Sequence, residues 1–191
     1  KATSHEGHVY EGAFENGVPH GRGKHTGPKG GVYEGEWAGG KRHGKGKIVK
    51  EGHVYDGQWE KDMPHGHGVW TEPDGHVYEG PWENGKRHGL CKLILPNGSV
   101  YEGTNEWGKP NGHGKSTYTN GAVYDGAWVE GKRHGRGKFT YGDGDVYEGE
   151  WAEGERRGYG KFTYADGSVY DGAWEANKRH GSGTRTYADG S

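Results

Sequence analysis

Histidine recurs at one position of this sequence and raises the question of metal binding. It precedes a glycine at six regularly spaced places, namely His20, His43, His65, His88, His134 and His180. Two pairings bring further ligand types together, because His67 follows His65 at alternate-residue spacing and Cys91 lies three residues after His88. Imidazole and thiolate are common ligands of Zn²⁺. His65 with His67, or His88 with Cys91, could each supply half of a site that a second chain completes.

Spacing argues against one metal ion shared along this row of histidines. If each repeat contributes two strands, equivalent side chains in successive repeats lie roughly 9–10 Å apart. A zinc–nitrogen bond measures only about 2.0–2.1 Å, so one ion cannot reach two of them. We therefore interpret the recurring histidines as residues that fix a turn, and we expect no metal and no cofactor.

Catalytic chemistry would need a nucleophile, a base and an orienting acid that stand apart from the repeated background. The recurring Glu and Asp residues after tyrosine, such as Glu11 and Asp56, resemble solvated strand residues. A catalytic site would also interrupt the repeat locally, and most of the chain shows no interruption. The sequence therefore predicts a protein that is not an enzyme and has no catalytic residues.

Paired cations recur in every second repeat. They are Lys41-Arg42, Lys86-Arg87, Lys132-Arg133 and Lys178-Arg179. A row of such pairs along one edge would suit an anionic lipid headgroup, such as a phosphoinositide, or an acidic partner. The alternative is a solvated turn whose own acids, such as Glu83 and Glu130, balance the charge. Both interpretations remain open from the sequence.

Composition excludes several classes of protein. Among 191 residues, only 28% are hydrophobic while 42 are glycine and eight are tryptophan, which does not suit an ordinary compact globule. The formal net charge of −2 argues against a nucleic-acid partner. Cys91 is the single cysteine, which suits a reducing compartment, and no apolar stretch approaches the roughly 20 residues that span a bilayer. We therefore expect a cytoplasmic protein.

Internal repeats organise the whole chain. The triplet Tyr-Glu/Asp-Gly recurs in steps of 23, 22, 23, 23, 23, 23 and 23 residues, with an aromatic residue usually four positions after the tyrosine and a Gly-x-Gly pair further on. We predict one array over residues 1–191, with a partial upstream repeat at 1–8. The eight repeats begin near Val9, Val32, Val54, Val77, Val100, Val123, Val146 and Val169. The partial repeat suggests a piece of a longer array.

Alternation within each repeat predicts two β-strands joined by a polar turn. Tyr124, Gly126 and Trp128 share one face of the first strand, and Gly135 with Gly137 share a face of the second. The turn between them is expected over residues 130–135. We also expect the strand glycines to lie directly beneath the aromatic rings, as a floor without side chains. The predicted fold is all-β, an elongated, twisted antiparallel sheet of consecutive hairpins, forming a solenoid-like ribbon about 75–80 Å long.

These residues resemble the MORN repeat, whose pattern runs Tyr-x-Gly-x-Trp-x-x-Gly-x-x-x-Gly-x-Gly. Repeat six matches it at every position, through Tyr124, Gly126, Trp128, Gly131, Gly135 and Gly137. The long, unadorned array is most similar to the cytoskeletal MORN scaffolds of protists. That resemblance implies a scaffold that binds proteins and forms a homodimer, at the cytoskeleton or a membrane-associated structure. It equally allows a phosphoinositide-binding targeting module, or the non-catalytic arm of a larger lipid kinase or methyltransferase.

Four apolar or aromatic residues are candidates for a protein interface. Leu90 and Ile94 share an otherwise polar face, where they pack either against Val77 and Val100 or against a partner. Trp107 lies in the most irregular stretch of the array. Tyr187 lies on the last strand, whose open edge could recruit a strand from a second copy.

Overall fold

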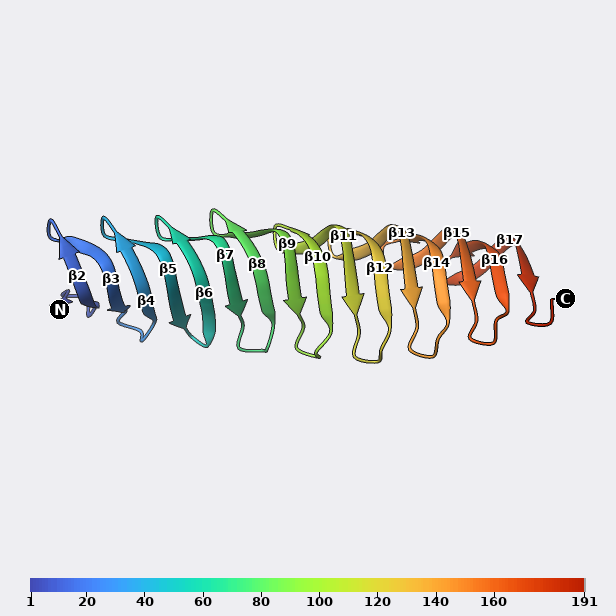
Figure 1. The fold of residues 1–191 in the computed structure, drawn as a ribbon, viewed down its shortest axis with the longest axis horizontal. Coiled ribbons are helices and arrows are strands. Elements are labelled where there is room, and N and C mark those ends of the chain that lie inside the picture. Colours follow the sequence, from blue (N-terminus) through green and yellow to red (C-terminus); the bar gives the residue numbers. More distant parts are fainter. Residues whose placement is uncertain (191) are drawn as a thin grey trace. The chain divides into compact units, whose positions relative to one another are not determined.

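The computed structural model describes residues 1–190, which form 17 strands and no helix (Figure 1). This confirms the predicted all-β class. A segment able to cross a membrane as a helix is accordingly absent from this part of the chain. Contacts divide the chain after Pro96 into two compact units, in which each strand pairs antiparallel with the strands next to it in sequence.

The two units contain hairpins of similar length. Unit 1 contains β1 (Ala2–Thr3), β2 (Val9–Glu15), β3 (Val18–Thr26), β4 (Val32–Ala38), β5 (Lys41–Lys50), β6 (His53–Glu60), β7 (Met63–Thr71), β8 (Val77–Glu83) and β9 (Lys86–Ile94). Unit 2 contains β10 (Val100–Glu106), β11 (Lys109–Thr117), β12 (Val123–Val129), β13 (Lys132–Thr140), β14 (Val146–Ala152), β15 (Glu155–Thr163), β16 (Val169–Glu175) and β17 (Lys178–Thr186).

The turn within each hairpin is shorter than the sequence suggested. Between β12 and β13 it consists of Glu130 and Gly131, whose φ angles are 49° and 81°. Two successive residues with positive φ match the twist of the flanking strands and allow a two-residue turn. The Lys-Arg-His segment expected in the turn therefore belongs to the second strand, and Lys132 pairs with Val129 across the hairpin.

The two glycines of each Gly-x-Gly pair have different roles, which corrects the expectation of a shared floor. Gly135 has a φ of 59° and lies in a β-bulge, because one residue of β12 opposes three of β13 between the pairs Gly126–Gly137 and Trp128–Arg133. Gly137 is the glycine of the pair that lies beneath the Tyr124 ring. A Cβ atom there would lie 2.5 Å from Cε2 of the Tyr124 ring, which leaves no room for any side chain.

Tyrosine and tryptophan rings alternate to form the core. The buried Tyr124 ring meets Trp128 edge-on at 5.1 Å and Trp151 of the following repeat at 5.3 Å between centroids. Its hydroxyl donates to the Ala127 carbonyl at 2.9 Å, while Trp151 Nε1 donates to the Gly137 carbonyl at 3.1 Å. Repeat seven is therefore joined to repeat six by both ring packing and a hydrogen bond.

Burial of the tyrosine row predicts loss of stability in alkali. Burial raises the pKa of Tyr33, Tyr124 and Tyr147 from 10.0 to about 12. The unfolded chain releases these protons near pH 10, but the folded chain retains them until about pH 12, so stability falls as pH rises across this window. We expect tryptophan fluorescence to report unfolding together with the rise in tyrosinate absorbance. Full tyrosine ionisation near pH 10 in a still-folded chain would contradict this.

Candidate functional site

The sheet of each unit has two faces of different chemistry. The aromatic face is the one that carries the tyrosine and tryptophan rings. The opposite face carries a row of alternating charges, in which Lys138 lies between Asp125 and Glu148 on the neighbouring strands. Alternating charges largely balance one another in water, so this row is typical of a solvated surface.

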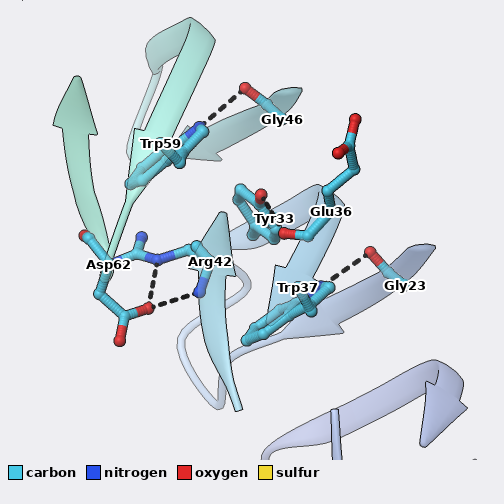
Figure 2. Close-up of polar contacts among 8 residues, drawn as sticks. All are labelled: Gly23, Tyr33, Glu36, Trp37, Arg42, Gly46, Trp59 and Asp62. Atoms are coloured by element: carbon cyan, nitrogen blue, oxygen red, sulfur yellow. Dashed lines mark hydrogen bonds and ion pairs between the residues drawn. The ribbon is translucent and has the colours of Figure 1, made fainter. Parts of the chain in front are cut away.

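Arginine side chains cover part of the aromatic face. Figure 2 shows Arg42 reaching past the row of rings to Asp62, and its guanidinium carbon lies 4.3 Å from the centroid of Trp59. Arg42 Nε donates to the Asp62 carboxylate at 3.0 Å, and Nη2 donates to the Asp62 carbonyl at 2.8 Å. Stacking and hydrogen bonding together hold the guanidinium over the tryptophan.

The same arginine arrangement recurs in unit 2. Arg133 lies 4.3 Å from the Trp151 centroid and donates to the Gly154 carbonyl at 2.8 Å. Arg156 lies 4.4 Å from the Trp174 centroid and donates to the Asn177 carbonyl at 2.8 Å. In each case the guanidinium stacks on the tryptophan of the next repeat and bonds to the turn that follows it.

Proline replaces this arginine in three repeats, at Pro19, Pro64 and Pro110. Pro19 has no guanidinium to place over Trp37, the tryptophan of the following repeat. A pocket of about 420 Å³ lies there, with Trp37, Tyr33 and Ile48 among its walls and Lys29 and Lys50 among its lining residues. The aromatic face of unit 1 is therefore hollowed beside Trp37.

The predicted cation pairs divide between two environments. The arginines Arg42, Arg87, Arg133 and Arg179 lie over aromatic rings. The lysines of the same row are exposed. Two lysines of this row form ion pairs with acids of the next turn, namely Lys109 with Glu130 at 2.6 Å and Lys132 with Glu153 at 2.5 Å. An anionic ligand at this edge would therefore meet the exposed Lys41, Lys86, Lys132 and Lys178 before the partly buried Arg42, Arg87 and Arg133.

The contrast between the two cations of a pair gives a prediction. Arg133→Ala should lower the free energy of unfolding by about 1–2 kcal/mol, because it removes a desolvated cation–π contact and its hydrogen bond. Lys132→Ala is the matched control, and loss of its exposed ion pair should cost at most about 1 kcal/mol. Urea denaturation of both variants measures the difference, and equal effects would show that the guanidinium adds no stability.

The predicted metal pairs lie in unit 1. His65 Nε2 lies 3.6 Å from the Glu60 carboxylate across the hairpin, and His67 is exposed on the same strand. His88 is exposed, whereas Cys91 is buried and burial raises the pKa of its thiol to about 11. A thiol of that pKa stays protonated at neutral pH and is a poor metal ligand.

Three metal-ligand side chains come together elsewhere in the described chain, at Glu72, Asp74 and His76 in the link between β7 and β8. The Asp74 carboxylate and His76 Nδ1 lie 2.9 Å apart, while Glu72 accepts a hydrogen bond from Arg87 at 2.9 Å. Their polar atoms are thus already engaged with one another and with Arg87, so the cluster is explained without a metal ion.

The four predicted interface residues differ in exposure. Leu90 is 74% exposed and Trp107 is 65% exposed, whereas Ile94 is half-buried and pairs with Val77 across β8 and β9. Tyr187 is exposed, and the Arg185 guanidinium lies 4.7 Å from its centroid. Pairing with Val77 therefore accounts for Ile94, whereas Leu90, Trp107 and Tyr187 are exposed.

Sequence reasoning missed the arginine covers and the pocket beside Trp37. The signal was the exchange of proline for arginine at one position of the repeat, which changes whether the next tryptophan is covered. A second signal was the residue four positions after each bulge glycine, which pairs with the repeating tyrosine. Its size differs greatly between repeats, as at His25, Ile48, Trp70 and Phe139. The residue types at these two positions therefore determine how far the aromatic face is covered by side chains.

Comparison with known sequences finds one family. The sequence model described as MORN repeat matches residues 10–32, 33–51, 55–77, 78–100, 101–123, 124–146, 147–169 and 170–191. Each segment begins at a repeating tyrosine, and the segments follow one another directly except at residues 52–54. No curated protein matches the sequence.

Comparison with solved structures finds similar folds at low sequence identity. The wild-type TCP10 domain of Danio rerio CPAP has a TM-score of 0.56 and 14% identity, over 99% of this chain and 89% of that one. A point mutant of that domain has a TM-score of 0.53 and 13% identity, over 99% and 94%. The Drosophila melanogaster SAS-4 TCP domain, in complex with a proline-rich motif of Ana2, has a TM-score of 0.43 and 12% identity, over 90% and 81%. At these identities the likeness to the Danio rerio domain is one of fold.

Proposed function

This chain belongs to the MORN-repeat family, and from that membership and its surfaces we propose that it is a non-catalytic scaffold that binds proteins. The observation that carries the proposal is the uneven cover of the aromatic face. Arg42 fills the space over Trp59, but a pocket of about 420 Å³ remains beside Trp37. Aromatic walls with a few polar groups are typical of binding sites. Placement at the cytoskeleton or a membrane-associated structure of the cytoplasm belongs to the same proposal.

Site-specific photo-cross-linking tests this function. A benzophenone amino acid placed at Ile48 on the aromatic face, or at Lys45 on the opposite face, is used in the full chain in cell extract. Saturable cross-links to particular proteins from position 48 would support the proposal, and the probe at position 45 controls for random encounter. Equal labelling from both positions, or none from either, would contradict a protein-binding aromatic face.

Self-association as a homodimer is a further part of the proposed scaffold. Exposed aromatic and apolar side chains such as Trp107 and Tyr187 offer contact area of the kind enriched at protein interfaces. Light scattering across a concentration series tests this. A mass near twice 20.9 kDa at high micromolar concentration is expected, and a constant monomer mass would exclude the dimer.

Weak lipid binding is the expected result for the lysine row. Lysines that recur every second repeat lie roughly 19–20 Å apart by strand spacing, so one headgroup engages one of them, and each contributes only about 1 kcal/mol. We expect little pelleting with phosphoinositide vesicles at physiological salt. Lys41→Glu, Lys86→Glu and Lys132→Glu together should leave the fold intact, because the neighbouring arginines keep their contacts. Strong pelleting that this triple variant abolishes would make membrane targeting the primary function.

A further inference from the structure

We infer that the pocket beside Trp37 binds an acidic protein segment that inserts an apolar side chain. The inference rests on the proposed protein-binding function and names the chemistry of the partner. Three observations carry it: the apolar walls of the pocket, the positive charge at its rim, and the larger side chains that other repeats carry at the register position of Ile48.

The walls of the pocket are apolar and fixed in place. Trp37 is buried and meets the rings of Tyr10 and Tyr33 edge-on, with centroids 5.2 Å away in both cases. Its Nε1 donates to the Gly23 carbonyl at 3.2 Å, so the indole presents no unsatisfied donor to the pocket. Ile48 completes the apolar wall. Binding of an apolar side chain against these walls is favourable, because it removes apolar surface from water.

Histidine adds a neutral wall at physiological pH. His25 lies 6.2 Å from Trp37 between ring centroids and stacks on His8 at 5.1 Å. Burial, helped by His8 and Arg42, lowers the pKa of His25 below 6.5. Its imidazole is therefore uncharged at pH 7, and it contributes surface to the pocket without adding positive charge.

The rim supplies an excess of positive charge. Arg42 is balanced by the Asp62 carboxylate at 3.0 Å. Lys29 and Lys50 also line the pocket, and no ion pair formed within residues 1–190 engages either ammonium group. Two uncompensated lysines beside an apolar cavity favour a ligand that carries carboxylates next to an apolar group.

Other repeats carry larger side chains at the register position of Ile48. Ile48 pairs with Tyr33 in β4 and β5, and the same register position holds Trp70 in β7 and Phe139 in β13. Both larger residues are compatible with the hairpin. Ile48 is smaller than either, and the pocket that it lines beside Trp37 is the space that the partner's side chain would occupy.

Fluorescence anisotropy with three labelled peptides tests the proposed chemistry on the full chain. The acidic, apolar probe is GEEDFLDEEG, and the matched probes are GEEDSSDEEG, which lacks the apolar pair, and GKKRFLRKKG, which reverses the charge. We expect the first probe to bind at least about tenfold more tightly than either of the others, a difference of about 1.4 kcal/mol. Equal binding of all three, or binding of only the basic probe, would overturn the inference.

Two variants then locate the binding. Ile48→Trp fills the pocket with a residue that the register position already accepts at Trp70, and Lys29→Glu with Lys50→Glu reverses the rim charge. Each should weaken the acidic, apolar probe by about tenfold or more. Leu93→Trp, at the equivalent position of β9, and Lys24→Glu with Lys45→Glu, on the opposite face, are the matched controls and should leave affinity unchanged.

Melting curves confirm that each variant is folded before its affinity is interpreted. Loss of binding in the controls as well, or unchanged binding in both pocket variants, would place the peptide elsewhere and refute the pocket. If the peptides fail to bind while cross-links from position 48 still capture proteins, the partner chemistry is wrong and the scaffold function stands. Failure of both experiments would remove the protein-binding function itself.

Discussion

Replacing Trp151 by alanine is expected to destabilise unit 2 by about 3–5 kcal/mol, the range typical of removing a large buried aromatic side chain. Trp151 is 3% exposed and contacts the rings of Tyr124, Phe139 and Tyr147. Its removal leaves a cavity between two repeats and deprives the Gly137 carbonyl of its indole donor. It also leaves the Arg133 guanidinium without the ring beneath it.

Trp107→Ala is the matched control for this prediction, because it deletes the same side chain from an exposed turn. Trp107 is 65% exposed, so its loss should change the free energy of unfolding by no more than about 0.5 kcal/mol. Urea denaturation followed by far-ultraviolet circular dichroism measures both variants. Similar midpoints for Trp107→Ala and Trp151→Ala would mean that the tryptophan row does not form the core.

Adding a single methyl group at Gly137 should destabilise the array by roughly 2–3 kcal/mol, the upper part of the usual range for overpacking. The new Cβ would lie 2.5 Å from Cε2 and 2.6 Å from Cζ of Tyr124. That ring is fully buried, held between Trp128 and Trp151, and cannot move aside without opening the core. The strand must therefore shift, which strains the pairing of Gly137 with Gly126.

Gly27→Ala separates this steric effect from the general cost of replacing glycine. A Cβ at Gly27 would meet only the Gly31 carbonyl oxygen, at an ordinary contact distance of 3.6 Å, and its backbone requires no positive φ. We expect a change below about 1 kcal/mol. A Gly137→Ala chain that unfolds at the same urea concentration as Gly27→Ala would show that the tyrosine ring does not need the glycine floor.

The strand pattern and the aromatic core could be predicted from the sequence because both follow from alternation. Tyr124, Gly126 and Trp128 are two residues apart, and a strand places such residues on one face whatever its surroundings. The floor under the ring followed from the same argument, and Gly137 fulfils it. These features could be identified from spacing alone, because nearly the same pattern recurs in successive repeats.

Backbone conformation at the turn and the bulge could not be read from spacing. Glu130 has a φ of 49°, although glutamate has no special preference for that region, because the twist of β12 and β13 selects a two-residue turn. Gly135 and Gly137 look equivalent in the sequence, but only Gly135 absorbs the extra residues of the longer strand. Both outcomes depend on pairing between strands and not on residue type.

Side-chain direction decided the role of the cation pairs. Lys132 and Arg133 are adjacent in sequence, but alternation places the arginine on the aromatic face and the lysine at the solvent-exposed tip. The sequence pattern indicated one charged turn that contained both cations, because the second strand of the hairpin was expected to begin after them. A correct strand boundary would have assigned Arg133 to the same face as Trp128.

The hydrogen bonds of the tryptophan row have a direction along the chain that bears on how the protein is made. Trp59 and Trp151 donate to Gly46 and Gly137, which lie 13 and 14 residues earlier in the sequence. During synthesis each indole thus emerges from the ribosome after its acceptor strand, so a new hairpin can dock at once on the completed one before it. Arg133, in contrast, donates to the carbonyl of Gly154, which is made 21 residues later. The order of synthesis therefore allows a newly made hairpin to bond first to the hairpin before it and later to the hairpin after it.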